Sequence, residues 1–532
     1  MTAAIASVSP NELADWLEDL EEIALIDVRE QGDYAQGHLL FASSLPLSRL
    51  ELIVERAIPR KSTRIVLCDQ GDGGLVVRAA VVLSQMGYTN LYQLAGGVVA
   101  WSDAGYRTFS GIYVPSKAFG EIVEHYYDTP NIDPDALARM VQSSDNVKIF
   151  DCRPKLEFRR MSIPGAVNCP GGELLLRLPE ILPSRETVVV VNCAGRTRSI
   201  LGAQTLINGG IPNPVMALRN GTMGWQLAGY EVDRARDNVV SMPGKAGQAQ
   251  AKDLAQAWAE REAVRSISWD TYLRLGQDAD RTTYLFDVRD IEEYQAGTPE
   301  GAVLAPAGQL VQATDSYVGT LKSRIVVFDD KKVRAIMAAT WLAKAGWDEV
   351  YILTDAPHEV CHAPATGPIG PAPAISQDRV MSPSELAAQL DDGSVWLLDL
   401  ATSPEFLNGH IAGAHFCIRS RMMNALSKLD PEKDIVLTSP DGVLAAWALP
   451  EVAAVWPRKV HLLSGGTQGW QLSGMALDKG FQETLEPPTD LWHTPSSEFG
   501  GGKAAMAEYI EWETGLIPKL KGEPGLRFRL PY

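Results

Sequence analysis

Short apolar runs that end in aspartate recur four times along the chain. They read IALID, VKIFD, TYLFD and VWLLD, and each is followed by a second apolar run, namely RIVLC, TVVVV, RIVVF and DIVLT. Helix-like stretches and a third, shorter apolar run complete each repeat. Runs of this length are typical of buried strands, and their alternation with helices predicts a parallel sheet covered by helices on both faces. We therefore expect an α/β protein in which one unit occurs four times.

The repeats divide the chain into four domains followed by an extension. Segments rich in Gly, Pro and Ala separate the second repeat from the third and the third from the fourth, as expected of linkers. The final segment has too little apolar periodicity to fold alone, so we expect it to pack on the other domains, with Trp492 and Trp512 as anchors. The predicted ranges are 1–110, 111–240, 250–360 and 375–480 for the four domains and 481–532 for the extension.

Composition and charge narrow the possible functions. The 532 residues are 45% hydrophobic and 21% charged, and no apolar run approaches the roughly 20 residues that cross a bilayer. A net charge of −18 without a basic stripe argues against nucleic acid or anionic membrane as partners. The six cysteines form no CxxC pair, and the first residues lack the basic start of a signal peptide. We therefore predict a cytoplasmic protein that binds neither nucleic acid nor membrane.

The second repeat carries the candidate chemistry, in a loop that reads CAGRTRS. The loop residues are Cys193, Ala194, Gly195, Arg196, Thr197, Arg198 and Ser199. A cysteine at the carboxyl end of a parallel strand lies where open α/β sheets bind their ligands. Loop N–H groups, the dipole of the following helix and two arginines would all favour the thiolate, which is the nucleophilic form. We expect Cys193 to be the nucleophile and Arg196, at the loop apex, to be the preferred contact for an anionic substrate.

With an upstream Asp-x-Arg, a PGAVN turn and a closing Gly-x-x-x-Trp, this loop makes the second repeat resemble the rhodanese family. The resemblance implies a multidomain thiosulfate sulfurtransferase in which Cys193 carries a persulfide and residues 194–199 bind the sulfur donor. It gives Asp151 and Arg153 a supporting role. The implied partners are a small-molecule donor, thiosulfate or a related persulfide, and an acceptor that is a thiol or a protein cysteine. No metal or organic cofactor is required.

The other three repeats lack a thiol at the equivalent position. The spacing from Asp151 to Cys193 leads to Asp69 in the first repeat and to Asp329 in the third, and strand alignment leads to Ser439 in the fourth. The cysteine of the first repeat lies one place earlier, on the strand, where its side chain should point away from the loop. We therefore expect the first, third and fourth domains to be inactive and to serve as structural or docking units.

Other functions fit the sequence less well. Phosphatases of this fold need Cys-x5-Arg, whereas Cys193 and Arg198 are spaced as Cys-x4-Arg. The segment 358–362 reads HEVCH, but prolines flank it, and the zinc-protease motif requires a helix. A scaffold or sulfur-relay protein that uses its degenerate domains for protein binding is the main alternative. A redox-sensing thiol at Cys193 is a third.

Overall fold

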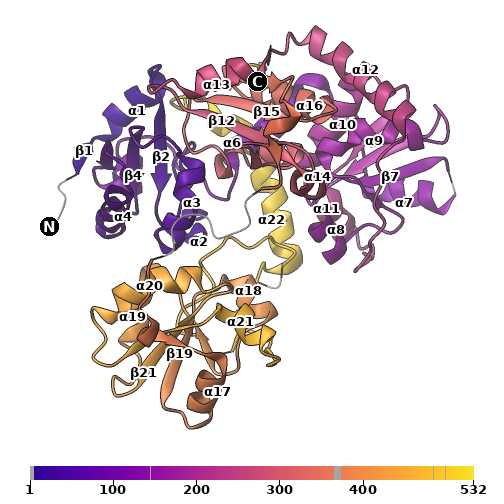
Figure 1. Cartoon of the computed structure of the whole chain (residues 1–532). Helices are drawn as coiled ribbons and strands as arrows, with labels where there is room; N and C mark the ends of the chain where they lie inside the picture. Colours follow the sequence, from indigo (N-terminus) through magenta and orange to yellow (C-terminus); the bar gives the residue numbers. More distant parts are fainter. Residues whose placement is uncertain (1–4, 144, 365–372, 483, 498) are drawn as a thin grey trace.

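The computed structural model describes residues 5–143, 145–364, 373–482, 484–497 and 499–532. It contains four parallel five-stranded sheets, each with the strand order first, fifth, fourth, second, third (Figure 1). Helices flank every sheet, so the prediction of four tandem α/β domains and an extension is confirmed. Within the described residues, no helix combines the length and the apolar character needed to cross a membrane.

The first domain alternates strands with helices. Its strands are β1 (Ala6–Val8), β2 (Ile23–Asp27), β3 (Ser43–Ser44), β4 (Arg64–Cys68) and β5 (Leu91–Leu94). Its helices are α1 (Pro10–Glu18), α2 (Gln31–Tyr34), η1 (Leu47–Arg49), α3 (Leu50–Ala57), α4 (Gly74–Gln85) and α5 (Gly97–Asp103). Consecutive residues of β2 enter different apolar cores, Leu25 on one face of the sheet and Ile26 on the other. The strand is therefore buried on both sides, as its unbroken apolar sequence requires.

The second domain repeats this plan after a long helix, α6 (Val114–Tyr127), which packs on α10. Its strands are β6 (Asn131–Ile132), β7 (Val147–Asp151), β8 (Val167–Asn168), β9 (Val188–Asn192) and β10 (Val215–Leu218). Its helices are α7 (Pro134–Gln142), α8 (Lys155–Arg160), η2 (Gly171–Glu173), α9 (Leu174–Ile181), α10 (Thr197–Gly209) and α11 (Gly221–Leu227). Helix α6 thus belongs to the second domain in space and covers the helix that follows the CAGRTRS loop.

The third domain follows the linker helix α12 (Lys245–Arg261). Its strands are β11 (Ser266–Ile267), β12 (Thr283–Asp287), β14 (Val303–Leu304), β15 (Arg324–Phe328) and β16 (Glu349–Leu353), with β13 (Thr298–Pro299) and β17 (Cys361–His362) as an antiparallel pair. Its helices are α13 (Trp269–Gly276), α14 (Ile291–Ala296), α15 (Ala307–Gln312), η3 (Thr314–Ser316), α16 (Val333–Lys344) and η4 (His358–Val360). The HEVCH segment therefore forms a single 3-10 turn and part of a strand, not an α-helix.

The fourth domain has the same order and leads into the extension. Its strands are β18 (Val380–Met381), β19 (Val395–Asp399), β20 (Ala414–Phe416), β21 (Asp434–Thr438) and β22 (Val460–Leu463). Its helices are η5 (Gln377–Arg379), α17 (Pro383–Asp391), α18 (Ser403–Asn408), η6 (Arg419–Arg421), α19 (Met422–Leu426), α20 (Val443–Ala453) and α21 (Gly466–Leu472). The extension contains α22 (Gly502–Thr514) and η7 (Ile517–Leu520). Helix α22 contacts α6 and α11, so the extension reaches back to the second domain (Figure 1).

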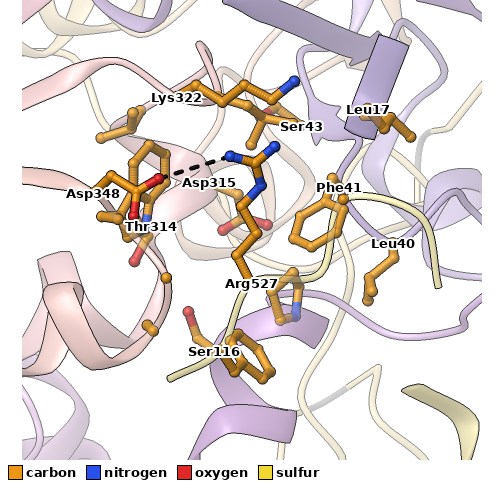
Figure 2. Close-up of a pocket in the computed structure, with 18 residues that line it drawn as sticks. Leu17, Leu40, Phe41, Ser43, Ser116, Thr314, Asp315, Lys322, Asp348 and Arg527 are labelled. Carbon is orange, nitrogen blue, oxygen red and sulfur yellow. Dashed lines mark ion pairs between the residues drawn. The ribbon is translucent and has the colours of Figure 1, made fainter. Parts of the chain in front are cut away.

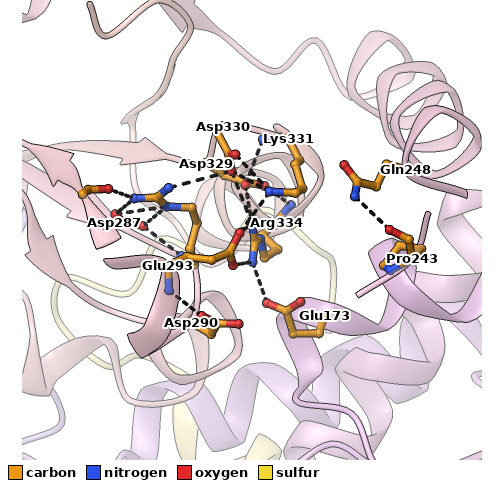
Figure 3. A network of polar contacts seen from close by, with 12 residues as sticks. Glu173, Pro243, Gln248, Asp287, Asp290, Glu293, Asp329, Asp330, Lys331 and Arg334 are labelled. Atoms are coloured by element: carbon orange, nitrogen blue, oxygen red, sulfur yellow. Dashed lines mark hydrogen bonds and ion pairs between the residues drawn. The ribbon is translucent and has the colours of Figure 1, made fainter. Parts of the chain in front are cut away.

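Equivalent elements meet at two domain interfaces, between the first and fourth domains and between the second and third, while the first and third domains are joined by contacts such as Lys322 to Asp19 at 3.0 Å. Between the first and fourth domains, η1 faces η6 and Arg419 pairs with Glu51 at 2.8 Å. Between the second and third, η2 faces α15 and Arg334 pairs with Glu173 at 2.9 Å (Figure 3). The second and third domains also share one continuous apolar core, in which Trp341 of α16 is fully buried. The candidate site therefore lies in a domain that is packed on several sides.

Candidate active site

Strand register places Cys193 at the carboxyl edge of the second sheet. Strands β7 and β9 pair in parallel with Asp151 opposite Asn192, and Cys193 follows directly. The N–H of Cys152 donates to the Asn192 carbonyl at 2.9 Å, so Cys152 and Cys193 leave adjacent strands side by side. Cys193 is only 2% exposed. The loop then turns into α10, which begins at Thr197.

Gly221, the first residue of α11, packs against the backbone of the Cys193 loop. Gly221 has a φ of +54°, and a Cβ atom there would lie 2.5 Å from the Cys193 carbonyl oxygen and 2.6 Å from that of Gly195. Only glycine allows both this backbone conformation and this approach. The next residue, Thr222, donates its N–H and its hydroxyl to the Cys193 carbonyl at 2.8 and 2.9 Å. The closing Gly-x-x-x-Trp motif therefore fixes the backbone of the cysteine itself.

The surroundings of the Cys193 sulfur favour its ionised form. Burial alone would raise the pKa of this thiol. The Cys152 thiol, the Arg198 charge and the hydroxyl and N–H of Ser199 outweigh burial and lower the pKa of Cys193 to about 6. The distance from Cys193 Sγ to Ser199 Oγ is 3.5 Å, and Ser199 is fully buried. At neutral pH the sulfur is therefore mainly thiolate, the form that attacks electrophiles.

The two arginines of the loop, Arg196 and Arg198, bind different carboxylates. Arg198 lies beside the sulfur and is held by both oxygens of Glu157 at 2.8 Å. The Arg196 guanidinium instead binds both oxygens of Glu121 at 2.7 Å and also contacts Glu124, which ties the loop to α6. Arg196 Nη1 also donates to Asn220 Oδ1 at 3.1 Å, so the contact of Arg196 with an anionic substrate, which stays a prediction, would have to compete with these partners. Arg198 is the arginine that acts electrostatically on Cys193.

Asp151 and Arg153 form a buried ion pair at the end of β7. Arg153 Nε and Nη2 donate to the two Asp151 oxygens at 2.9 and 2.6 Å, and Asn192 Nδ2 lies 3.3 Å from the same carboxylate. The same Asp-x-Arg pair occurs in the first and third domains, which have no thiol at the loop position. Its presence there indicates a framework that joins the ends of adjacent strands and is not specific to the cysteine chemistry.

The extension covers the mouth of the loop. The Thr197 hydroxyl donates to Glu513 Oε1 at 2.6 Å. A Cβ atom on Gly195 would lie 3.3 Å from both Glu513 Oε2 and the Tyr509 ring, so α22 sits directly over this glycine. Glu513 is 1% exposed. Sequence reasoning missed these residues, because nothing in the acidic sequence of the extension connects it with a loop some 300 residues earlier.

Lys117 is a second residue of the site that the sequence did not reveal. Its ammonium group lies 4.8 Å from the ring centres of Tyr509 and Trp512 and 5.2 Å from that of Trp492. Burial lowers the pKa of Lys117 to about 8, although the nearby Glu513 carboxylate opposes this. Both predicted tryptophan anchors of the extension thus pack around a buried lysine next to the Cys193 loop.

In the other three domains the residue at the position of Cys193 is Asp69, Asp329 or Ser439, and its side chain hydrogen-bonds to backbone N–H groups of the same loop. The Asp69 carboxylate accepts three backbone N–H groups of its loop at 2.9, 3.3 and 3.4 Å. The Asp329 carboxylate accepts two, at 3.1 and 2.8 Å, and pairs with Arg334 at 2.8 Å. Ser439 Oγ accepts the N–H of Ala445 at 3.3 Å. A carboxylate or hydroxyl therefore occupies the place that the sulfur has in the second domain.

One acidic cluster resembles a metal site. Ligand atoms of Glu173, Asp290 and Glu293 lie within 4.8 Å of one another. Arg177 pairs with Glu173 at 2.6 Å and with Asp290 at 3.2 Å. Arg334 contacts Glu173 and Glu293 from the third domain (Figure 3). These arginines supply the positive charge that a cation would otherwise provide, so we interpret the cluster as part of the interface between the second and third domains.

A separate cavity lies between the first domain, the third domain and the extension (Figure 2). Arg527 projects into it and pairs with Asp348 at 3.7 Å, and Phe41 and Lys322 are among the other lining residues. Burial raises the pKa of Asp315, at its edge, to about 7, and the Lys117 charge opposes this. None of the lining residues belongs to the Cys193 loop.

Comparison with known proteins agrees with this architecture. The family model of the rhodanese-like domain matches residues 9–104, 133–228, 270–358 and 382–473. A crystal structure of thiosulfate sulfurtransferase from Pseudomonas aeruginosa superimposes with a TM-score of 0.93 at 38% sequence identity, covering 98% of this chain and 99% of that one. The four-domain arrangement is therefore present in a solved structure.

Curated relatives match shorter parts of the chain. A sulfurtransferase from Allochromatium vinosum is 28% identical over 101 residues, which are 19% of this chain and 92% of that protein. The probable adenylyltransferase/sulfurtransferase MoeZ from Mycobacterium tuberculosis is 32% identical over 98 residues, 18% of this chain and only 24% of that protein. Four matched segments, each containing one parallel sheet with the same strand order, show that the chain belongs to the rhodanese-like family.

Proposed function

We propose that the protein is a sulfurtransferase that carries sulfane sulfur as a persulfide on Cys193. The observation that carries this proposal is the contrast between the four equivalent loops. The loops of the first, third and fourth domains hold a carboxylate or hydroxyl, whereas the loop of the second domain holds a buried thiol whose pKa is lowered to about 6. The resemblance to thiosulfate sulfurtransferase over nearly the whole chain supports thiosulfate, or a related persulfide, as the donor.

The proposed reaction has two displacements. The Cys193 thiolate attacks the outer sulfur of thiosulfate, the S–S bond breaks, and its electron pair leaves with sulfite. The persulfide lies in the loop, where the Arg198 charge and the Ser199 N–H stabilise the negative sulfur, joined by the Ser199 hydroxyl when it turns from the Arg196 carbonyl to the sulfur. An acceptor thiol or protein cysteine then takes the outer sulfur and restores the Cys193 thiolate. The loop residues Ala194 to Ser199 surround the donor, and Asp151 with Arg153 holds the strand ends.

The same proposal gives the other domains a structural role. Their loops lack a thiol at this position, and their ion pairs join the third domain to the second and the fourth domain to the first. All six cysteines are free in the structure, which fits a reducing compartment, and we place the protein in the cytoplasm on this basis. A small-molecule donor and a thiol or protein acceptor are then the only partners that the reaction needs.

The intact mass of the purified protein after incubation with thiosulfate tests the proposal. We expect wild type to gain one sulfur atom, and Cys193→Ser to gain none. Cys169→Ser is a matched control, because Cys169 is a fully buried cysteine of the same domain, and burial raises its pKa. Wild-type protein that gains no sulfur from thiosulfate or from any persulfide donor would refute a persulfide on Cys193.

One alternative is favoured by a specific observation. The three loops without a thiol are what a scaffold or relay protein with degenerate domains would show. Such a protein would bind partner proteins equally well as wild type and as Cys193→Ser, and would load no sulfur. The mass experiment therefore separates the two functions directly.

A further inference from the structure

One oxygen of the Glu513 carboxylate is buried at the active-site loop without a well-aligned hydrogen bond. Oε1 accepts the Thr197 hydroxyl at 2.6 Å, whereas Oε2 accepts no well-aligned hydrogen bond from the described residues, the Tyr509 phenol being a nearby donor to the same carboxylate. Oε2 lies over Gly195, two residues after the nucleophile. An unsatisfied carboxylate oxygen that is removed from water is unfavourable, so this position calls for a hydrogen-bond donor from a ligand.

The surroundings of Glu513 suit proton transfer. The Lys117 charge interacts with Glu513 from α6, and the Tyr509 phenol is near enough to both Glu513 and Cys193 for their charges to raise its pKa. The rings of Trp492, Tyr509 and Trp512 surround the lysine. The carboxylate is therefore oriented by the Thr197 hydroxyl and shielded from bulk water, as a positioned base must be.

We propose that Glu513 is a catalytic base for the second displacement and that it selects acceptors that arrive as neutral thiols. This inference rests on the proposed persulfide on Cys193. The acceptor S–H gives its proton to Glu513 Oε2, and its sulfur forms a new S–S bond with the outer sulfur of the persulfide anion. The bond between Cys193 Sγ and the outer sulfur breaks, and its electron pair stays on Sγ as the thiolate. Glu513 returns the proton to the outer sulfur of the persulfide that leaves.

The same carboxylate affects the two displacements in opposite ways. A neutral thiol gains a proton acceptor, whereas an anion such as thiosulfate or sulfite meets a negative charge. Neutralising Glu513 should therefore slow discharge to thiols without slowing loading from thiosulfate. A residue with a merely structural role would impair both steps alike.

Rapid-mixing measurements on Glu513→Gln in the full chain test this prediction. Protein loaded with thiosulfate is discharged with dithiothreitol, with sulfite, and with an aromatic thiol acidic enough to arrive as a thiolate. We expect discharge to dithiothreitol to fall about 100-fold, within the usual range for loss of a general base. Discharge to the two anionic acceptors and loading from thiosulfate should stay the same or become faster. Glu508→Gln, an exposed glutamate on the same helix, should change none of these rates.

Two further measurements distinguish a role in proton transfer from a general loss of activity and from a failure to load sulfur. Thr197→Val keeps the Glu513 carboxylate but removes the hydroxyl that orients it, so we expect a smaller loss with the same preference for anionic acceptors. Equal losses with all three acceptors, or no loss with dithiothreitol, would overturn the role of Glu513. Failure of wild type to load any sulfur, seen by mass before discharge, would instead overturn the persulfide itself and this inference with it.

Discussion

Removing the Ser199 hydroxyl should destabilise the thiolate form of Cys193 relative to the thiol and so raise the pKa of Cys193 by a measurable amount. The fully buried hydroxyl oxygen accepts from the Cys193 thiol at 3.5 Å and donates to the Arg196 carbonyl at 2.8 Å, and when the sulfur ionises the hydroxyl can turn to donate to it where water cannot. A hydrogen bond to a charged group contributes about 1.5 to 3 kcal/mol, and 1.36 kcal/mol corresponds to one pH unit, so Ser199→Ala should move the ionisation of Cys193 upward by about 1 to 2 pH units. Because the wild-type pKa is about 6, the change falls where it can be titrated.

The assay is the rate of Cys193 alkylation by iodoacetamide as a function of pH. The alkylation rate is proportional to the fraction of Cys193 that is ionised, so in wild type it should fall as the pH drops through about 6. At pH 6.5, Ser199→Ala should react roughly tenfold more slowly, and the two proteins should converge at alkaline pH. Thr205→Ala is the control, since this buried hydroxyl of the same helix donates to the Leu201 carbonyl and accepts the Trp341 indole N–H, with no bond to Cys193 among the contacts of the described residues. An unchanged midpoint in Ser199→Ala would refute the assignment of the hydroxyl as a stabiliser of the thiolate.

Three further predictions concern residues outside the loop. Burial raises the pKa of Asp399 from 3.8 to about 6, so its negative charge lowers the free energy of unfolding by roughly 3 kcal/mol above pH 6 and by nothing below about pH 4. Asp399→Asn should therefore raise the urea midpoint at pH 8 but not at pH 4, and equal effects at both pH values would contradict this. Asp69→Ala leaves three backbone N–H groups without their acceptor and should lower stability by about 3 kcal/mol in urea unfolding, whereas a change below 1 kcal/mol would show that the carboxylate does not organise its loop. Gly111 has a φ of +84°, and a Cβ atom there would lie 2.6 Å from the Trp512 ring. Gly111→Ala should therefore displace α22 and speed the labelling of Cys193 by a bulky maleimide. Unchanged labelling would mean that this contact does not hold α22 over the Cys193 loop.

The sequence predicted most of the fold because its signals are local. Buried parallel strands must be continuously apolar, and four such sets with the same spacing leave little choice of architecture. The position of Cys193 followed from the same rule, since the residue after a central strand lies at the ligand edge of the sheet. The elements of the loop could thus be placed before the structure was known.

What the sequence did not predict depends on contacts between distant segments. Arg196 and Arg198 look equivalent in the loop, and only the placement of Glu121 on α6 and Glu157 on α8 separates their roles. The approach of Glu513 to Thr197 depends on how the extension crosses three domains, and no periodicity encodes such a path. Electrostatic partners brought together by tertiary packing are therefore the part of a site that a single sequence conceals.

The position of α22 in the chain has a consequence for synthesis. The ribosome makes this helix after all four domains, so the second domain can fold while its loop is still open. During that interval Tyr509 and Glu513 do not yet cover the loop, and oxidants or the thiols of other proteins react with any thiolate they can reach. Docking of α22 places Tyr509 and Glu513 over the loop. We therefore expect a chain truncated before α22 to be oxidised at Cys193 more readily than the full chain.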